Sequence, residues 1–138
     1  MQAKEELQTH ARSSPAVFGY PRGRDRRGLR FVISVSLQLD SQGCLRRLQS
    51  TGHAVGPQGG NTVCAAATAL MRSASRALAD HSSIVISGHA PREGVLEIEV
   101  LQCGAEYHAY LRGVTDVLLR GLKDLALDEP SEVTIRQS

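Results

Sequence analysis

Apolar and polar residues alternate along the segment LRFVISVSLQLD at residues 29–40. A two-residue period is typical of a half-buried strand, and here it runs through the apolar positions Phe31, Ile33, Val35, Leu37 and Leu39. Turn residues follow at 40–43, and CLRRLQST at 44–51 has the weaker pattern of a return strand. The first ordered part of the chain is therefore predicted to be a β-hairpin.

A helical period replaces the alternation after residue 61. Apolar residues recur every three to four positions between Val63 and Leu78, and Asn61 stands where an N-cap residue belongs. A second hairpin, a second helix and a short last strand are predicted at 82–100, 106–127 and 133–137. The order ββαββα with a short C-terminal strand predicts an α+β fold in two layers. An antiparallel sheet built from two hairpins carries two helices on one face.

Charge is distributed unevenly along the 138 residues. Residues 1–30 hold seven basic and three acidic side chains, a net charge of +4, whereas residues 31–138 have a net charge of −2. Residues 1–28 also lack a sustained period and contain several Gly, Pro and Ser residues. We therefore expect residues 1–28 to be an Arg-rich, disordered extension, and residues 29–138 to form one folded domain whose acidic balance argues against direct nucleic-acid binding.

Composition excludes several classes of protein. No apolar run approaches the roughly 20 residues that span a bilayer, and the N-terminus lacks the apolar core of a secretory signal. Three cysteines, an odd number without paired spacing, argue against a disulfide framework and for a reducing compartment. The pattern favours a cytoplasmic protein without membrane contact, and neither a metal site nor a cofactor motif is recognisable.

Candidate chemistry is concentrated between Gly52 and Leu70. His53 stands at a strand end, a glycine-rich loop follows, and Cys64 falls at the third position of the predicted helix. Unpaired N–H groups and the helix dipole favour a thiolate there, and a nearby imidazole could accept its proton. A cysteine on an alanine-rich helix is more often an inert core residue, so spacing alone leaves both interpretations open. A second Gly-His-Ala at 88–90 is interpreted as a coincidence in a turn, because no cysteine follows it.

This segment resembles the signature of the bacterial ribosomal-processing cysteine proteases, the Prp family. Gly52-His53-Ala54 matches the start of that signature, and Gly59, Val63-Cys64-Ala65-Ala66 and Leu70 match its end. The resemblance extends over about residues 29–136. It implies a small α+β homodimer in which Cys64 is the nucleophile and His53 the general base and acid. It also implies a substrate, the N-terminal extension of a large-subunit ribosomal protein.

The chain departs from the family pattern at a few positions. Asn61 replaces the family's Asp, and Thr68 replaces its Ser; we expect both to support the site, together with Gly52 and Gly59. The loop between the two catalytic residues is one residue shorter than usual and lacks an aromatic residue. It is expected to line the substrate cleft with Ala54, Val55, Gly56, Pro57, Gln58 and Gly60. The alternative is a non-catalytic homodimeric ribosome-assembly or interaction protein with the same fold.

The expected homodimer also follows from the layering. Two helices on a single sheet leave its other face uncovered, and Val32 is predicted to point outward there. We expect the dimer to bury a largely apolar surface on that face.

Overall fold

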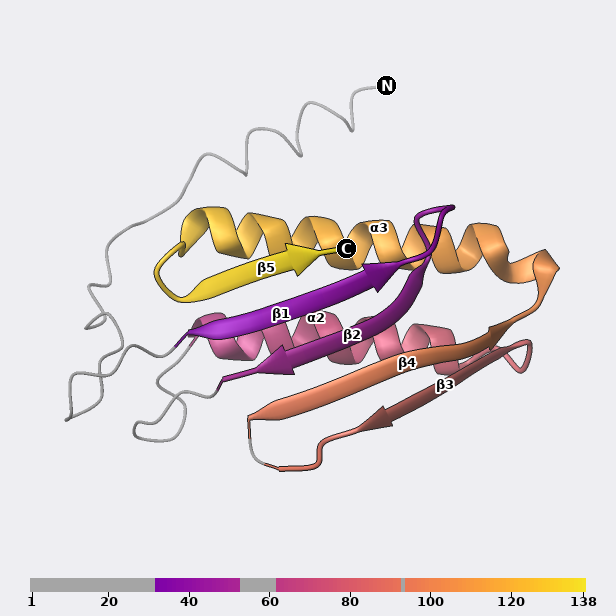
Figure 1. The fold of residues 1–138 in the computed structure, drawn as a ribbon, viewed down its shortest axis with the longest axis horizontal. Helices are drawn as coiled ribbons and strands as arrows, with labels where there is room; N and C mark the ends of the chain where they lie inside the picture. Colours follow the sequence, from indigo (N-terminus) through magenta and orange to yellow (C-terminus); the bar gives the residue numbers. More distant parts are fainter. Residues whose placement is uncertain (1–31, 53–61, 93) are drawn as a thin grey trace, which may run out of the picture.

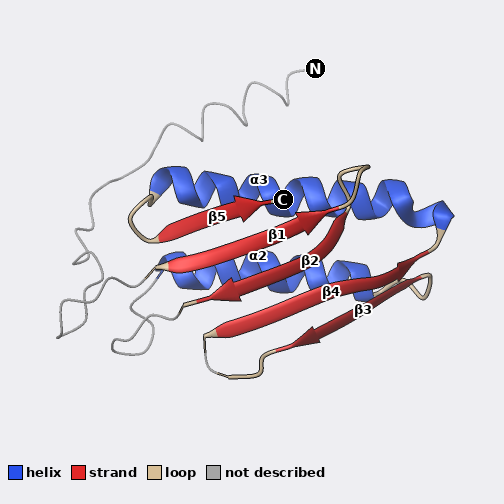
Figure 2. Cartoon of the chain, viewed as in Figure 1, coloured by secondary structure: helices blue, strands red, loops and turns tan. Residues whose placement is uncertain are grey.

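The computed structural model describes residues 32–52, 62–92 and 94–138, which form one sheet and one layer of helices (Figures 1 and 2). The predicted hairpins are present as β1 with β2 and as β3 with β4. In chain order the elements are β1 Ile33–Leu39, β2 Leu45–Thr51, α2 Thr62–Ala79, β3 Ile84–His89, β4 Val95–Cys103, a 3₁₀ turn Ala105–Tyr107, α3 His108–Asp128 and β5 Val133–Gln137.

The sheet has the strand order β3-β4-β2-β1-β5. The two hairpins join through antiparallel pairing of β2 with β4, and α2 and α3 both cover the same face (Figure 1). The predicted α+β class is thus confirmed. One pair is parallel rather than antiparallel, because α3 returns the chain to the end of the sheet where β1 begins, so β5 runs alongside β1 in the same direction (Figure 2).

The core lies between the sheet and the two helices. Its strand contribution comes from the inward positions of the alternating pattern, such as Val35 and Leu37, which are 1% and 0% exposed. Its helix contribution comes from residues three and four positions apart. The buried helix residues are Ala67, Met71, Ala74 and Leu78 in α2 and Leu111, Thr115, Leu118 and Leu122 in α3.

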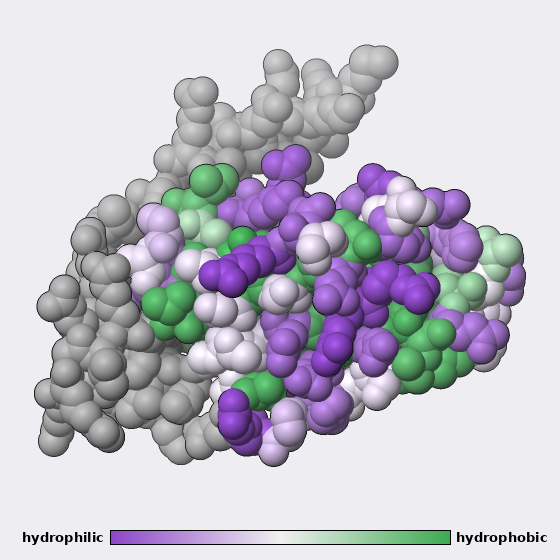
Figure 3. All heavy atoms as spheres, in the orientation of Figure 1, coloured by the Kyte–Doolittle hydropathy of each residue, from purple (hydrophilic) through white to green (hydrophobic). Residues whose placement is uncertain are grey.

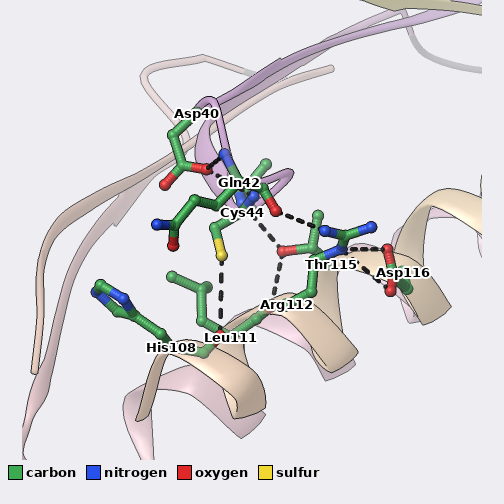
Figure 4. Close-up of polar contacts among 9 residues, drawn as sticks. Asp40, Gln42, Cys44, His108, Leu111, Arg112, Thr115 and Asp116 are labelled. Carbon is green, nitrogen blue, oxygen red and sulfur yellow. Dashed lines mark hydrogen bonds and ion pairs between the residues drawn. The ribbon is translucent and has the colours of Figure 1, made fainter. Parts of the chain in front are cut away.

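The turn between β1 and β2 is anchored to α3 by polar contacts (Figure 4). The Leu45 N–H donates to the Thr115 hydroxyl at 3.0 Å, and that hydroxyl donates to the Leu111 carbonyl at 2.7 Å. The Arg112 guanidinium donates to the Gln42 carbonyl. Burial of Thr115 costs little because its hydroxyl is fully satisfied. This anchor lies at the opposite end of the sheet from the start of α2 (Figure 1).

The uncovered face of the sheet is mostly polar, and the expectation of a largely apolar surface there is wrong. Figure 3 views this face and shows mainly hydrophilic side chains across its centre. The strand alternation that buries apolar residues under the helices places their polar neighbours outward. By register these are Ser34, Ser36, Gln38, Arg47, Gln49, Thr51, Ser87, His89, Glu97, Glu99, Thr134 and Arg136.

Candidate active site

Cys64 is the third residue of α2, as predicted from the sequence. The helix begins at Thr62, so the backbone N–H groups around Cys64 belong to its first turn and have no acceptors within the helix. The positive end of the helix dipole lies at the same place and favours an anion. The local backbone is therefore suited to stabilise a negative charge that develops beside Cys64 during a reaction.

The Cys64 side chain is partly buried and borders a cavity of about 530 Å³ between α2 and the sheet. The cavity follows one face of the helix, where residues four, seven, eight and eleven positions after Cys64 are Thr68, Met71, Arg72 and Ser75. The wall on the sheet side comes from the ends of three strands. Its residues are Ser50 near the end of β2 and Gly52 just after it, Gly88, His89 and Ala90 at the end of β3, and Gly94, Val95, Leu96 and Ile98 at the start of β4.

The structure brings three predicted site residues to this cavity: Cys64, Thr68 and Gly52. Thr68 lies one helical turn after Cys64 and is partly buried. The remaining predicted residues lie outside the described residues. They are His53, Gly59, Asn61 and the loop residues Ala54, Val55, Gly56, Pro57, Gln58 and Gly60.

Gly52 is required by its surroundings. Its φ is +109°, a conformation that side-chain-bearing residues rarely adopt. A Cβ at this position would also overlap the carbonyl oxygen of Val32, which belongs to the chain entering β1. The first glycine of the Gly-His-Ala segment is thus explained by close backbone approach, and His53 is the next residue along the chain.

The second Gly-His-Ala segment begins at the end of β3 rather than in a turn. Gly88 and His89 are the last residues of β3 and border the Cys64 cavity. His89 Nε2 lies 3.2 Å from Glu97 Oε2, and the other Glu97 oxygen accepts a hydrogen bond from Gln49 Nε2 at 3.0 Å. Glu97 and Gln49 belong to the uncovered face of the sheet. The contacts with Glu97, which Gln49 in turn supports, therefore hold the His89 imidazole on the face of the sheet opposite to α2.

Most residues of the cavity wall were not predicted from the sequence. Met71, Arg72 and Ser75 follow Cys64 at helical spacing. The 3.6-residue period therefore predicts that they lie on the same helix face as Cys64. The residues from β3 and β4 had no such signal, because only the strand order brings them beside α2.

Burial distinguishes the other two cysteines, Cys44 and Cys103, from a reactive thiol. Cys44 is 3% exposed, and its thiol donates to the His108 carbonyl at 3.8 Å (Figure 4). Burial raises the pKa of the Cys44 thiol, and the Asp40 carboxylate raises it further. Burial, with a smaller effect of Glu106, likewise raises the pKa of the Cys103 thiol. Both thiols are therefore poor nucleophiles at neutral pH.

We predict that limiting iodoacetamide alkylates Cys64 before Cys44 and Cys103. Cys64 lies at a helix N-terminus beside an open cavity, whereas burial keeps the other two thiols protonated. Peptide mass mapping after short exposures measures the order of labelling. Earlier labelling of Cys44 or Cys103 would contradict this assignment.

Comparison with known proteins identifies the family. The model of the family described as cysteine protease Prp matches residues 32–134. The chain belongs to the Prp cysteine protease family. It is accordingly a cysteine protease, a hydrolase, and the matched range includes Cys64 and the cavity around it. No curated protein matches the chain.

Solved structures share the fold. Two are of the essential ribosomal processing protease Prp from S. aureus, one with a covalently linked product peptide and one with a substrate peptide. Both are 16% identical to this chain, with TM-scores of 0.66 and 0.63, covering 78% of this chain and 100% of theirs. SMU.848 from Streptococcus mutans is 23% identical with a TM-score of 0.66, covering 78% of this chain and 94% of its own.

Two further observations concern what the described residues could bind. Within residues 32–52, 62–92 and 94–138, neither helix combines the length and apolar character that crossing a membrane requires. The same residues contain no group of three or more His, Cys, Asp or Glu side chains placed to hold a metal ion.

Proposed function

We propose that this protease removes the N-terminal extension of a large-subunit ribosomal protein, with Cys64 as nucleophile and His53 as general base and acid. The observation that carries the proposal is the position of Cys64 in the first turn of α2, at the wall of a cavity. The family match supports the protease class. The ribosomal processing protease from S. aureus, which shares this fold, supports the kind of substrate.

The proposed reaction has two steps. The Cys64 sulfur attacks the scissile carbonyl carbon while His53 takes the thiol proton, and first-turn N–H groups of α2 stabilise the oxyanion. His53 then protonates the leaving amine, the C–N bond breaks, and a thioester to Cys64 remains. Water attacks this thioester with His53 as base, which releases the extension as a carboxylic acid and restores the thiol.

The supporting residues have proposed roles in this reaction. Gly52 directs the chain into residue 53, and Asn61 caps α2 so that its first turn stays open to the oxyanion. Thr68 presents a hydroxyl one turn from the thiol. The loop of residues 54–60 is proposed to lie against the bound peptide, with Gly59 retained from the family motif.

Incubation of the purified protein with the ribosomal precursor from the same organism tests this function. The proposal predicts that mass spectrometry finds the precursor shortened at its N-terminus to one defined product. The matched control is the same ribosomal protein made without its extension, which should stay intact. An uncut precursor, or cleavage of the control as well, would contradict the proposal.

We also propose that the protein is a homodimer that pairs through the groove between α2 and α3 rather than through the polar sheet face. Val117 lies in this groove and is 70% exposed. A Cβ built at Gly113, in the same groove, would meet no described heavy atom within 4 Å beyond its own helix backbone and chain neighbours. Sedimentation velocity at micromolar concentration should show a dimer, and Val117→Glu should shift it toward monomer because a carboxylate would then be buried. A wild-type monomer would contradict the proposal.

A further inference from the structure

We infer that Gly88 determines how large a substrate side chain the Cys64 cavity admits. Gly88 and Cys64 line the same cavity, one from β3 and the other from α2. The inference rests on the protease function proposed above and adds to it a residue that sets substrate specificity.

Position 88 faces the helix layer. Gly88 is opposite Ile98 of β4, and Ile98 is 3% exposed beneath the helices. Side chains two residues apart in a strand share a face, so Ile86 lies on this side as well, and it is packed against the core. The space between β3 and α2 is therefore filled by a side chain at Ile86 and left open at Gly88.

Neither the backbone nor the packing requires glycine at this position. Gly88 does not have the positive φ found at Gly43, Gly52 and Gly94. Apart from its chain neighbours, a Cβ added to Gly88 would have one heavy atom of the described residues within 4 Å, the Glu97 carbonyl oxygen at 3.8 Å. Glycine weakens a strand interior and often marks a place where another molecule or backbone approaches closely. What Gly88 provides here is open volume in the cavity that Cys64 also borders.

The chemistry of the wall indicates what fills this volume. Met71, Leu96 and Ile98 form its apolar part, and an apolar pocket favours an apolar occupant. Arg72 is exposed at the same cavity and disfavours a cationic side chain nearby. The structure therefore assigns the space at Gly88 to an uncharged, apolar side chain of the substrate near the scissile bond.

Peptide substrates that differ in one side chain test this assignment. Ala, Val, Leu and Phe are placed in turn at each of the two residues before and the two residues after the scissile bond. The value of kcat/KM is then measured for the wild type, Gly88→Ala and Gly88→Val. A misfit of about one methylene in an apolar pocket changes kcat/KM by roughly 10- to 200-fold. At one substrate position, Gly88→Val should therefore lower the ratio of kcat/KM for the peptide with the largest side chain to kcat/KM for the peptide with Ala by roughly 10- to 200-fold. Gly88→Ala should give a smaller change in the same direction.

Ser87→Val is the matched control. Ser87 is the neighbouring residue of β3, and its partner Glu99 places it on the uncovered face of the sheet. Ser87→Val adds the same valine side chain to β3 as Gly88→Val does, but on the face away from the cavity. Its preference among the peptide side chains should therefore match that of the wild type. Thermal unfolding of all variants checks that they fold.

The possible outcomes separate the inference from the proposed function. If the wild type cleaves these peptides but Gly88→Val keeps the wild-type preference, or slows all of them equally, the inference is overturned and the function stands. If both Gly88 variants fail to fold, the space serves the fold and the inference is again overturned. If the wild type cleaves neither the peptides nor the ribosomal precursor, the proposed function fails, and the inference fails with it.

Discussion

Replacement of Cys64 with alanine is expected to reduce cleavage of the ribosomal precursor by at least about a thousandfold. The substitution removes the sulfur that forms the thioester, and loss of the nucleophile from a covalent protease costs up to about 10⁶-fold in kcat. Alanine keeps the helix start intact because it has the highest helix propensity. Single-turnover kinetics measures the loss, and circular dichroism should show an unchanged fold.

Cys103→Ala is the matched control for this experiment. Its thiol donates to the Gly104 carbonyl at 3.4 Å and does not line the Cys64 cavity. Cleavage should stay within a few-fold of the wild type. Comparable loss in both variants would show that general thiol chemistry or stability, rather than the position of Cys64, accounts for the effect.

Gly52→Ala is expected to produce the second large effect, a loss of cleavage of about a hundredfold or more. Alanine at a φ of +109° is strained, and its Cβ would overlap the Val32 carbonyl oxygen, so the chain entering residue 53 has to move. Displacement of a catalytic group by about 1 Å can cost about 10²-fold. Backbone strain of this kind costs about 1–3 kcal/mol, so the melting temperature should fall as well.

Gly113→Ala is the matched control for Gly52→Ala, because it makes the same substitution at a glycine away from the Cys64 cavity. Gly113 lies inside α3, and apart from its own helix backbone and chain neighbours the described residues place no heavy atom within 4 Å of a Cβ built there. Alanine should raise the free energy of unfolding by up to about 1 kcal/mol through helix propensity and leave cleavage unchanged. Wild-type cleavage by Gly52→Ala would contradict the account of why the motif contains this glycine.

The local elements of the fold could be predicted from the sequence because they depend on local periodicity. Alternation placed Val35 and Leu37 in a strand with one buried face, and the position of Asn61 predicted that α2 begins at Thr62. The parallel pairing of β5 with β1 was not predicted, because it depends on where α3 returns the chain. The polar sheet face was missed because the expectation rested on Val32 alone.

Only the helical part of the candidate site could be predicted from the sequence. Cys64 and Thr68 lie four residues apart on one helix, so their positions at a common cavity follow from the helical repeat. Gly88, Leu96 and Ile98 belong to strands that reach the cavity through the order β3-β4-β2. No local pattern encodes that order, so residues from these strands were not predicted as part of the site.

Intact-mass spectrometry of the protease after acid quenching tests the central claim, that Cys64 forms an acyl-enzyme with the substrate extension. The protein is mixed with excess precursor, quenched within the first turnover and digested for peptide mapping. We expect a fraction of the protein to gain the mass of the released extension minus one water. The added mass should be on the peptide that contains Cys64 and should be absent from Cys64→Ala. Precursor cleavage without any covalent adduct, or an adduct on Cys44 or Cys103, would contradict it.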